Sequence, residues 1–315
     1  MTREEVEGAG EARLTPEEFD SIASTVSNWG RWGKQDERGA MNHLRPEHII
    51  AAARLVRSGR TVSMALEWNT IAGPDNPRPA LHYMTQLGDR DPGEPQTNAD
   101  FLGSDFHGKA CSHIDALCHC DFRGQLYNGV PQSTVGSAGA SFGSILTLAH
   151  GVIGRGVLLD VPRHRGLDWL EPGTAVMADE LEAVEASQGV RVGPGDIVLL
   201  RSGHFLRRTR LGAWPPFFLS AGLHPTAMPW LHAREISVLG ADGDSDARPS
   251  PVDEMLSPIH ALALNLMGVH LLDNLQLEDV AAVCAEEQRW EFLFVVAPLR
   301  VPRGTGSPIN PIAIF

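Results

Sequence analysis

Histidines and carboxylates gather in one short segment of the chain, Ser104–Phe122. In an extended chain His113 and Asp115 point to the same side, because alternate residues of a strand share a face. An imidazole nitrogen beside a hard carboxylate is a workable pair of ligands for a divalent metal ion. His119 lies four residues beyond Asp115, and an imidazole near a metal ion can carry protons at neutral pH. The segment therefore predicts metal-assisted acid–base chemistry.

Two other interpretations of this segment stay open. The histidines could be held by backbone carbonyls in a tight loop, a purely structural role. Cys111, Cys118 and Cys120 lie among them. We expect free thiols that pack as small apolar groups, because the chain begins with no secretory signal and buried cysteine commonly packs this way.

The overall composition excludes several classes of protein. The chain has 315 residues, with 26 Lys+Arg against 39 Asp+Glu and a formal net charge of −13. Phosphate binding needs clustered lysine and arginine, so we expect no nucleic-acid partner. No apolar run reaches the ~18 residues of a membrane span, so we expect no membrane association. These observations predict a soluble, cytoplasmic protein that acts on a small molecule.

Capping and apolar periodicity predict the elements that position the segment. Thr15, Pro16 and Glu18 form a capping box that begins a helix. Before it, residues 1–13 are expected to be disordered, and residues 14–315 to form a single domain. Further helices are predicted over Pro46–Val56, with Ile49, Ile50, Ala53 and Val56 on one face, and over Ala178–Ser187, His224–His232 and Pro258–Leu266.

Strands are expected between these helices. The predicted strands are Thr61–Trp68, Gly156–Val161, Asp196–Arg201, Ile236–Gly240, Gly268–Asp273, Phe292–Ala297 and Ile312–Phe315. Strands and helices alternate in the second half, which indicates an α/β architecture with a mixed sheet. Long loops are expected from Gly73 to Gly108, and loops of that length are often functional.

The histidine segment also resembles a known family. Ser112-His113-Ile114-Asp115-Ala116-Leu117-Cys118-His119, followed by Gly124–Gly129, is similar to the signature H-x-G-T-H-x-D-x-P-x-H of the metal-dependent cyclase/hydrolase family. That family includes bacterial kynurenine formamidase (arylformamidase) and isatin hydrolase. Other blocks resemble it in the same order: Asn28–Gly33, Asp36–Gly39, Gly195–Gly203, Leu239–Asp242, Pro258–His260, Leu272–Leu275 and Gly306–Pro308.

The resemblance implies a fold and roles for particular residues. The fold is a cyclase-like, swivelling β/β/α architecture with a mixed β-sheet and flanking helices, usually in homodimers or homotetramers. By resemblance, His113 and Asp115 are ligands of a divalent metal ion, zinc or manganese. His260 corresponds to a later ligand, and Asp273 to a ligand carboxylate that is usually glutamate. His119 corresponds to the catalytic acid/base.

Lys109 occupies the position of the first ligand histidine in the signature. An ammonium group repels a dication, so we expect this lysine to turn away, to lose its proton or to fill part of the metal's place. In the last case it would lie between Asp115 and Asp273 and take part in catalysis. The alternative is a surface lysine paired with Asp105 or Asp121. His107 could supply a ligand from two residues earlier, although that spacing is not the family's.

Four further residues are candidates for contact with the substrate. Trp29 and Trp32, together with Trp68 and Trp214, could line an aromatic pocket, although tryptophan is also ordinary core material. His224 begins a predicted helix near the active-site edge of the sheet. Asp242 follows a predicted strand, where we expect it to orient a neighbouring histidine or arginine.

The function predicted from the sequence is hydrolysis of a non-peptide C–N bond in an amide, formamide or lactam. The resemblance implies a metal-activated water molecule with His119 as the acid/base. One alternative is a metal-independent cyclase, dehydratase or lyase of a secondary-metabolite pathway. Another is a small-molecule binding protein that keeps the fold without catalysis.

Overall fold

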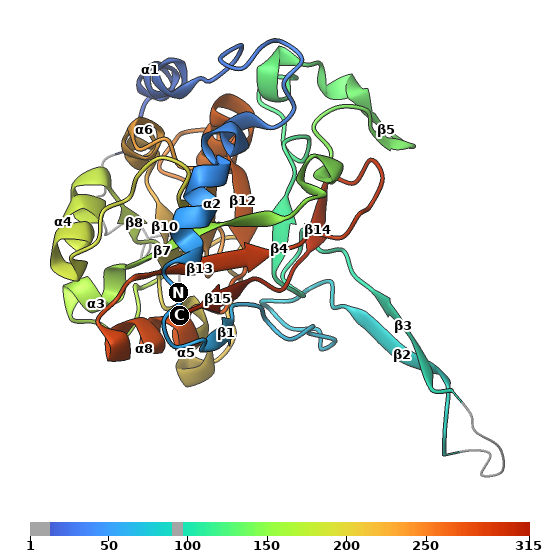
Figure 1. The fold of residues 1–315 in the computed structure, drawn as a ribbon. Helices are drawn as coiled ribbons and strands as arrows, with labels where there is room; N and C mark the ends of the chain where they lie inside the picture. The colour runs from blue at the N-terminus through green and yellow to red at the C-terminus, as the bar shows by residue number, and fades with distance from the viewer. Residues whose placement is uncertain (1–12, 90–96) are drawn as a thin grey trace.

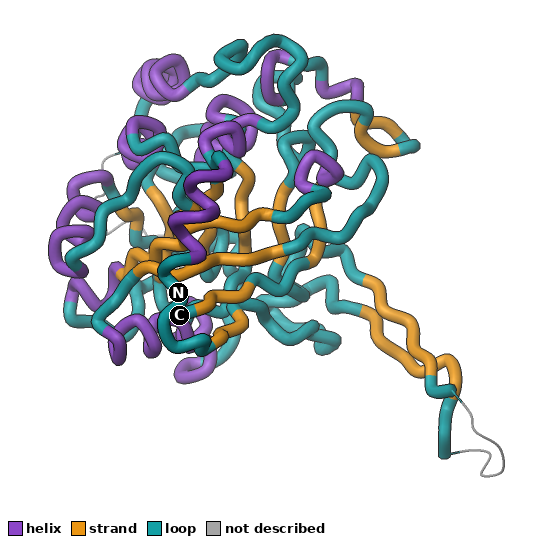
Figure 2. The backbone as a smooth tube through the Cα atoms, viewed as in Figure 1, coloured by secondary structure: helices purple, strands orange, loops and turns teal. Residues whose placement is uncertain are grey.

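One mixed β-sheet runs through the middle of the molecule, with helices packed around it (Figure 1, Figure 2). The computed structural model describes residues 13–89 and 97–315. In spatial order the nine strands are β1 (Thr61–Ser63), β15 (Ile312–Ile314), β13 (Glu291–Val296), β7 (Val152–Asp160), β9 (Ile197–Arg201), β11 (Val238–Ala241), β12 (His270–Asp273), β4 (His113–Asp115) and β14 (Gly306–Pro308). The predicted α/β architecture with a mixed sheet is confirmed.

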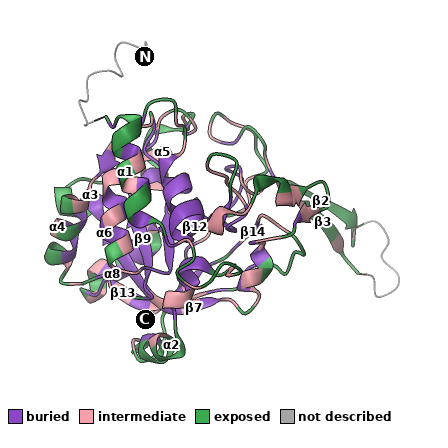
Figure 3. Cartoon of the chain, turned by 90° about the horizontal axis from the view of Figure 1, so that it is seen from above, coloured by how far each residue is buried: buried purple, intermediate pink, exposed green. Residues whose placement is uncertain are grey.

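The four central strands, β7, β9, β11 and β12, are parallel. All residues of β9, β11 and β12 are buried, as expected for parallel strands covered on both faces. These strands are near-continuous apolar runs in the sequence, which is why their positions could be predicted closely. Figure 3 shows this buried centre surrounded by half-buried and exposed helices.

Most of the described helices begin with a proline in the first turn. Thr15 caps the first helix and forms the predicted capping box with Glu18. The helices are α1 (Pro16–Val26), α2 (Pro46–Ala53), α3 (Val161–Arg165), α4 (Ala178–Gln188), α5 (His204–Leu211), α6 (Met228–Ala233), α7 (Pro258–His260), which continues as a π-helical segment over Ala261–Met267, and α8 (Glu278–Glu287). No helix within the described ranges is both long and apolar enough to cross a membrane.

The short strand β4 is the part of the sheet that matters most for the histidine segment. It runs antiparallel between β12 and β14, with His113 opposite Asp273 on one side and opposite Pro308 on the other. Residues paired directly across two antiparallel strands face the same side of the sheet. The register therefore brings Asp273 to the face that carries His113 and Asp115, although it lies far along the chain.

A two-stranded hairpin projects from the body of the protein (Figure 1). It consists of β2 (Leu81–Gln86) and β3 (Ala99–Gly103), within the region from Gly73 to Gly108 that the sequence predicted as loops. That prediction was wrong for the hairpin, because no buried face produces an apolar alternation there. Two smaller pairs complete the strands: β8 (Ala175–Val176) with β10 (Gly222–Leu223), and β5 (Val135–Gly136) with β6 (Gly139–Ala140).

Two elements near the amino terminus are shorter than predicted. The strand expected over Thr61–Trp68 ends at Ser63, because its partner β15 is preceded by Pro311, which has no N–H to extend the ladder. The helix expected over Pro46–Val56 ends at Ala53, and its predicted apolar face is wrong, since Ile50 is 57% exposed. Of the tail predicted to be disordered, residues 1–12 lie outside the described residues.

Candidate functional site

His113 and Asp115 lie at the centre of the site, on the same face of β4. His113 is 3% exposed and Asp115 is 0% exposed. The Nε2 atom of His113 lies 3.7 Å from Oδ1 of Asp115. The sequence prediction that these two side chains share a side of an extended segment is thus confirmed.

His107 approaches the same carboxylate from the loop before β4. Its Nδ1 atom lies 2.8 Å from Oδ1 of Asp115, and its Nε2 forms a 2.9 Å hydrogen bond with the hydroxyl of Thr305. Gly306 makes room for the ring: a Cβ there would lie 2.9 Å from Cε1 of His107 and 2.4 Å from the carbonyl oxygen of Ile114. His107, rather than Lys109, therefore completes a cluster with His113 and Asp115.

His260, the last residue of α7, closes the cluster from the other side. Its Nε2 atom lies 3.4 Å from Oδ2 of Asp273 and 3.7 Å from Oδ2 of Asp115. Its Nδ1 donates a 2.5 Å hydrogen bond to Asp246. Burial alone would lower the pKa of His260, but its hydrogen bonds to Asp246 and Asp273 raise that pKa well above its ordinary value.

The donor atoms of this cluster fit a divalent metal ion. His107, His113 and Asp115 form one group with ligand atoms within 4.8 Å of one another, and Asp115, His260 and Asp273 form a second. Apart from the 2.8 Å contact between Nδ1 of His107 and Oδ1 of Asp115, neither of these buried atoms has a hydrogen-bond partner among the described residues, and Oδ2 of Asp115, also buried, has none. Buried polar atoms are normally satisfied, and buried carboxylates need a compensating charge. A dication held between these nitrogen and oxygen atoms would meet both requirements.

The Asp246–His260 contact supports the same interpretation. A histidine that binds a metal ion usually donates its other N–H to a carboxylate, which fixes the ring orientation. Asp246 is fully buried and takes this role behind His260. Asp273 is also held in place, since it accepts a 3.2 Å hydrogen bond from the hydroxyl of Ser245.

His119 lies beside the cluster rather than within it. Its ring stacks on that of His107, with centroids 3.6 Å apart and planes inclined by 6°. The two groups of potential ligands do not include it. Burial lowers the pKa of His119 to about 4, against the opposing effect of Asp115. The imidazole is therefore neutral at pH 7, the form that can accept a proton.

A comparison with protein families agrees with this arrangement. The family model described as "Putative cyclase" matches residues 63–245, more than half of the chain.

The chain belongs to the cyclase family.

Solved structures with the cyclase fold extend the match over most of the chain. One described as a novel cyclase is 31% identical, covers 93% of this chain and 99% of its own, and has a TM-score of 0.83. Isatin hydrolase A from Ralstonia solanacearum is 20% identical, with 81% and 91% covered and a TM-score of 0.57. Isatin hydrolase A from Labrenzia aggregata is 19% identical, with 85% and 97% covered and a TM-score of 0.56. Among curated proteins, no sequence matches this chain.

Lys109 departs from the cyclase signature, and the structure shows where it goes. Its side chain is 5% exposed, so it is not a surface lysine, and it pairs with Asp244 rather than with Asp105 or Asp121. The ammonium also donates a 3.2 Å hydrogen bond to Oδ1 of Asn274. It does not lie between Asp115 and Asp273, so the prediction that it fills the metal's place is wrong. A carboxylate available on the neighbouring loop draws the ammonium away.

The four predicted substrate-binding residues are not part of the metal cluster. Trp29 donates a 2.7 Å hydrogen bond to the carbonyl of Asn265, and Trp32 packs edge-on against His43, with ring centroids 5.0 Å apart. His224 is fully buried and its Nδ1 accepts from the backbone N–H of Thr226. These contacts are structural, and substrate binding by these side chains stays a prediction.

Asp242 holds the start of α5. Its carboxylate accepts hydrogen bonds of 2.7–3.1 Å from the backbone N–H groups of Ser202, Gly203 and His204 and from the hydroxyl of Ser202. It is 1% exposed. It therefore positions the loop that leads to His204, rather than orienting a histidine or arginine side chain directly as the sequence suggested.

One residue of this cyclase site, Asp246, was not identified from the sequence, and His107 was predicted only as a possible ligand. In the sequence Asp246 is one of three alternating aspartates, with Asp242 and Asp244, and nothing local indicates that it faces His260. His107 was considered as a ligand but set apart by its spacing. The unusual signal was Lys109 itself, because a lysine in a ligand position implies that another residue supplies the ligand.

Proposed function

We propose that the protein is a hydrolase that cleaves a non-peptide C–N bond of an amide, formamide or lactam with the help of zinc or manganese. The observation that carries this proposal is the convergence of His107, His113 and Asp115 beside the neutral imidazole of His119, with the buried Oδ2 of Asp115 lacking a hydrogen-bond partner among the described residues. Membership of the cyclase family and likeness to the folds of isatin hydrolases agree with it.

The residues divide into two tasks in this proposal. His107, His113 and Asp115 would hold the metal ion, with His260 and Asp273 on the other side of Asp115. A divalent ion at this place would polarise the scissile carbonyl and make a water molecule more acidic. Asp246 keeps the Nδ1 proton of His260, so that Nε2 of this ring faces the carboxylates.

His119 carries the protons. As a neutral base it accepts a proton from the attacking water molecule, and as an imidazolium it returns that proton to the leaving nitrogen. Its stacking contact with His107 fixes the plane of the ring next to the ligands. The negative charge of Asp115 stabilises the imidazolium form of His119, because this carboxylate acts to raise the pKa of His119.

The test combines metal analysis with a substrate screen. The purified protein is expected to contain about one equivalent of zinc or manganese and to hydrolyse members of a panel of aryl formamides, lactams and isatin. Dialysis against a chelator should abolish the activity, and added metal should restore it. Full activity in protein shown to be metal-free would favour the metal-independent cyclase, dehydratase or lyase instead. We also propose that the protein is a homo-oligomer located in the cytoplasm.

A further inference from the structure

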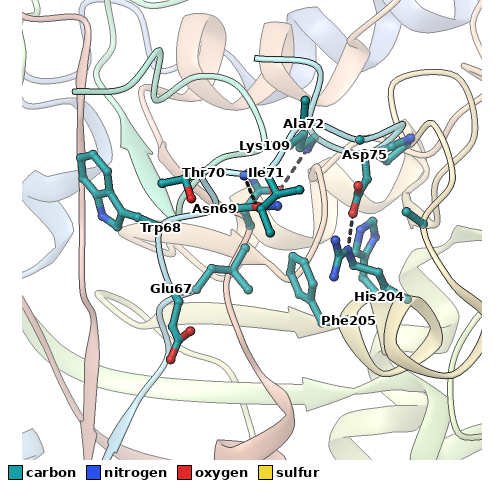
Figure 4. A pocket seen from close by; sticks show the side chains of 16 residues that line it. Glu67, Trp68, Asn69, Thr70, Ile71, Ala72, Asp75, Lys109, His204 and Phe205 are labelled. Atoms are coloured by element: carbon teal, nitrogen blue, oxygen red, sulfur yellow. Dashed lines mark hydrogen bonds and ion pairs between the residues drawn. The ribbon is translucent and has the colours of Figure 1, made fainter. Parts of the chain in front are cut away.

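A cavity of about 590 Å³ lies beside Lys109, outside the metal cluster (Figure 4). The segment from Leu66 to Asp75 forms one wall, and His204 and Phe205 of α5 lie across from it. A cavity of this size is typical of small-molecule sites. Two residues singled out from the sequence line it: Lys109, predicted to be catalytic, and Trp68, one of the tryptophans expected to line an aromatic pocket.

Two residues of the cavity lining lie close in the chain to the strands that carry the metal cluster. Lys109 and Asn274 both line the cavity, and Asn274 directly follows Asp273 in the chain. Leu66, another lining residue, donates its backbone N–H to the hydroxyl of Ser112 at 2.8 Å, next to His113. A molecule in this cavity would therefore contact residues that adjoin His113 and Asp273 in the chain or through a hydrogen bond, while the cluster side chains themselves do not line the cavity.

Lys109 shares its counter-ion with a second cation that lies outside the cavity lining. Lys109 and Arg248 both pair with Asp244, so two cations share one carboxylate. The side chains of Lys109 and Arg248 are 5% and 7% exposed. Of the two, Lys109 lines the cavity, whose other charged lining residues are Glu67 and the paired Asp75 and Arg208. The ammonium has three protons. Among the described residues it donates to Asp244 and Asn274, and one proton remains for a ligand.

The opposite side of the cavity is aromatic. The ring of His204 packs on Trp214 and Phe205, with centroids 4.6 and 4.8 Å away. Burial is the main cause and the positive charge of Lys109 the second cause that lower the pKa of His204 to about 3. The ring therefore stays uncharged. Trp68 adds an aromatic ring to the facing wall, formed by Leu66–Asp75. Flat aromatic ligands fit such a surface through stacked or edge contacts.

We propose that this cavity binds an aromatic carboxylate, with the ring against His204 and Phe205 and the carboxylate accepting a hydrogen bond from Lys109. The inference rests on the proposed function, because it states that the substrate of the hydrolase carries an aromatic ring and a carboxylate. Lys109 then has a role that a histidine at the same position could not fill: it leaves the metal cluster and recognises the substrate.

The experiment compares two probes that differ in the acceptor group. Benzoate and benzyl alcohol are titrated into the intact protein by calorimetry, with the parent and with Lys109→Met. We expect the parent to bind benzoate more tightly, and Lys109→Met to lose about tenfold to hundredfold in benzoate affinity, the range for a hydrogen bond to a charged group. Affinity for benzyl alcohol should change less than about twofold.

The chain supplies a matched control, since Lys34 is its only other lysine and is exposed. Lys34→Met should bind benzoate as the parent does. Asp244 keeps Arg248 as a partner in Lys109→Met, so this variant leaves no unpaired carboxylate and should fold, as thermal unfolding will verify. Lys109→Arg retains a cation and should lose less affinity than Lys109→Met.

Three results would overturn the proposal: equal affinity of the parent for the two probes, benzoate binding unaffected in folded Lys109→Met, or benzoate binding lost after dialysis against a chelator. The last would mean that the probe binds through the metal ion. Failure of the proposed function looks different. Then no amide, formamide or lactam would be cleaved, while benzoate would still bind in a manner dependent on Lys109.

Discussion

The rings of His119 and His107 lie face to face, 3.6 Å apart and inclined by 6°. One of the two belongs to the metal cluster and the other does not. This stacking places the neutral imidazole of His119 against His107, a proposed metal ligand. Removing His119 should affect the rate, and removing His107 should affect metal binding.

His119→Ala should lower the hydrolysis rate by about 10²–10⁴-fold, the usual contribution of a general acid or base. Metal content and thermal stability should stay close to the parent's, because His119 is not among the potential ligands. Steady-state kinetics and elemental analysis would check both. His150, which is exposed, provides the control His150→Ala, and a near-parental rate in His119→Ala would remove this residue from the mechanism.

His107→Ala should instead weaken metal binding, by at least the 10–100-fold typical of changes to groups that merely support a ligand. The reason is that Nδ1 of His107 faces Asp115 at 2.8 Å without another partner among the described residues. Chelator competition would measure the affinity. An unchanged metal affinity would show that His113, Asp115 and the His260 side of the cluster suffice.

Lys109→His restores the histidine of the family signature, but it should not increase metal affinity. The side chain at this position points to Asp244 and Asn274, and His107 already occupies the ligand position. Metal titration of the chelator-treated parent and variant would decide. A variant that gains tight zinc or manganese binding, against a parent that has none, would restore the idea that the lysine replaces the ion.

The projecting hairpin predicts a homo-oligomer. Leu81, Tyr83 and Leu102 are 59%, 54% and 52% exposed, and Tyr83 stacks on Phe101 with centroids 5.0 Å apart. A two-stranded hairpin alone is only marginally stable in water, so we expect a second copy of the chain to cover this one. Light scattering should show an oligomer for the parent and a smaller species for the Tyr83→Asp, Leu102→Asp double variant. A monomeric parent at micromolar concentration would refute this.

His43 predicts a loss of stability in acid. Burial lowers its pKa from about 6.5 to about 4, assisted by Arg31, His232 and Arg45 and opposed by Glu235. Below pH 6.5 the unfolded chain takes up a proton that the folded chain takes up only near pH 4. The contribution of His43 is thus complete above pH 6.5 and is lost as the pH falls towards 4. Denaturant unfolding at pH 7 and pH 5 should show a smaller loss for His43→Asn than for the parent, and equal losses would contradict the assignment.

Much of the fold and part of the site could be predicted from local sequence patterns. The strands β9, β11 and β12 are short apolar runs. A continuous apolar run by itself indicates a strand that is buried on both faces. The common side of His113 and Asp115 follows from the two-residue period of a strand, which holds whatever the strand pairs with.

The choice of metal-site residues depended on the tertiary structure. Lys109 pairs with Asp244, 135 positions away, and Asp246 reaches His260 only because α7 returns to the end of β11. The hairpin was missed because its apolar residues face outward, where no core imposes a pattern. Periodicity records which side of an element is buried, but electrostatic pairing depends on distances between segments. Those distances are set only when the sheet register places β4 between β12 and β14.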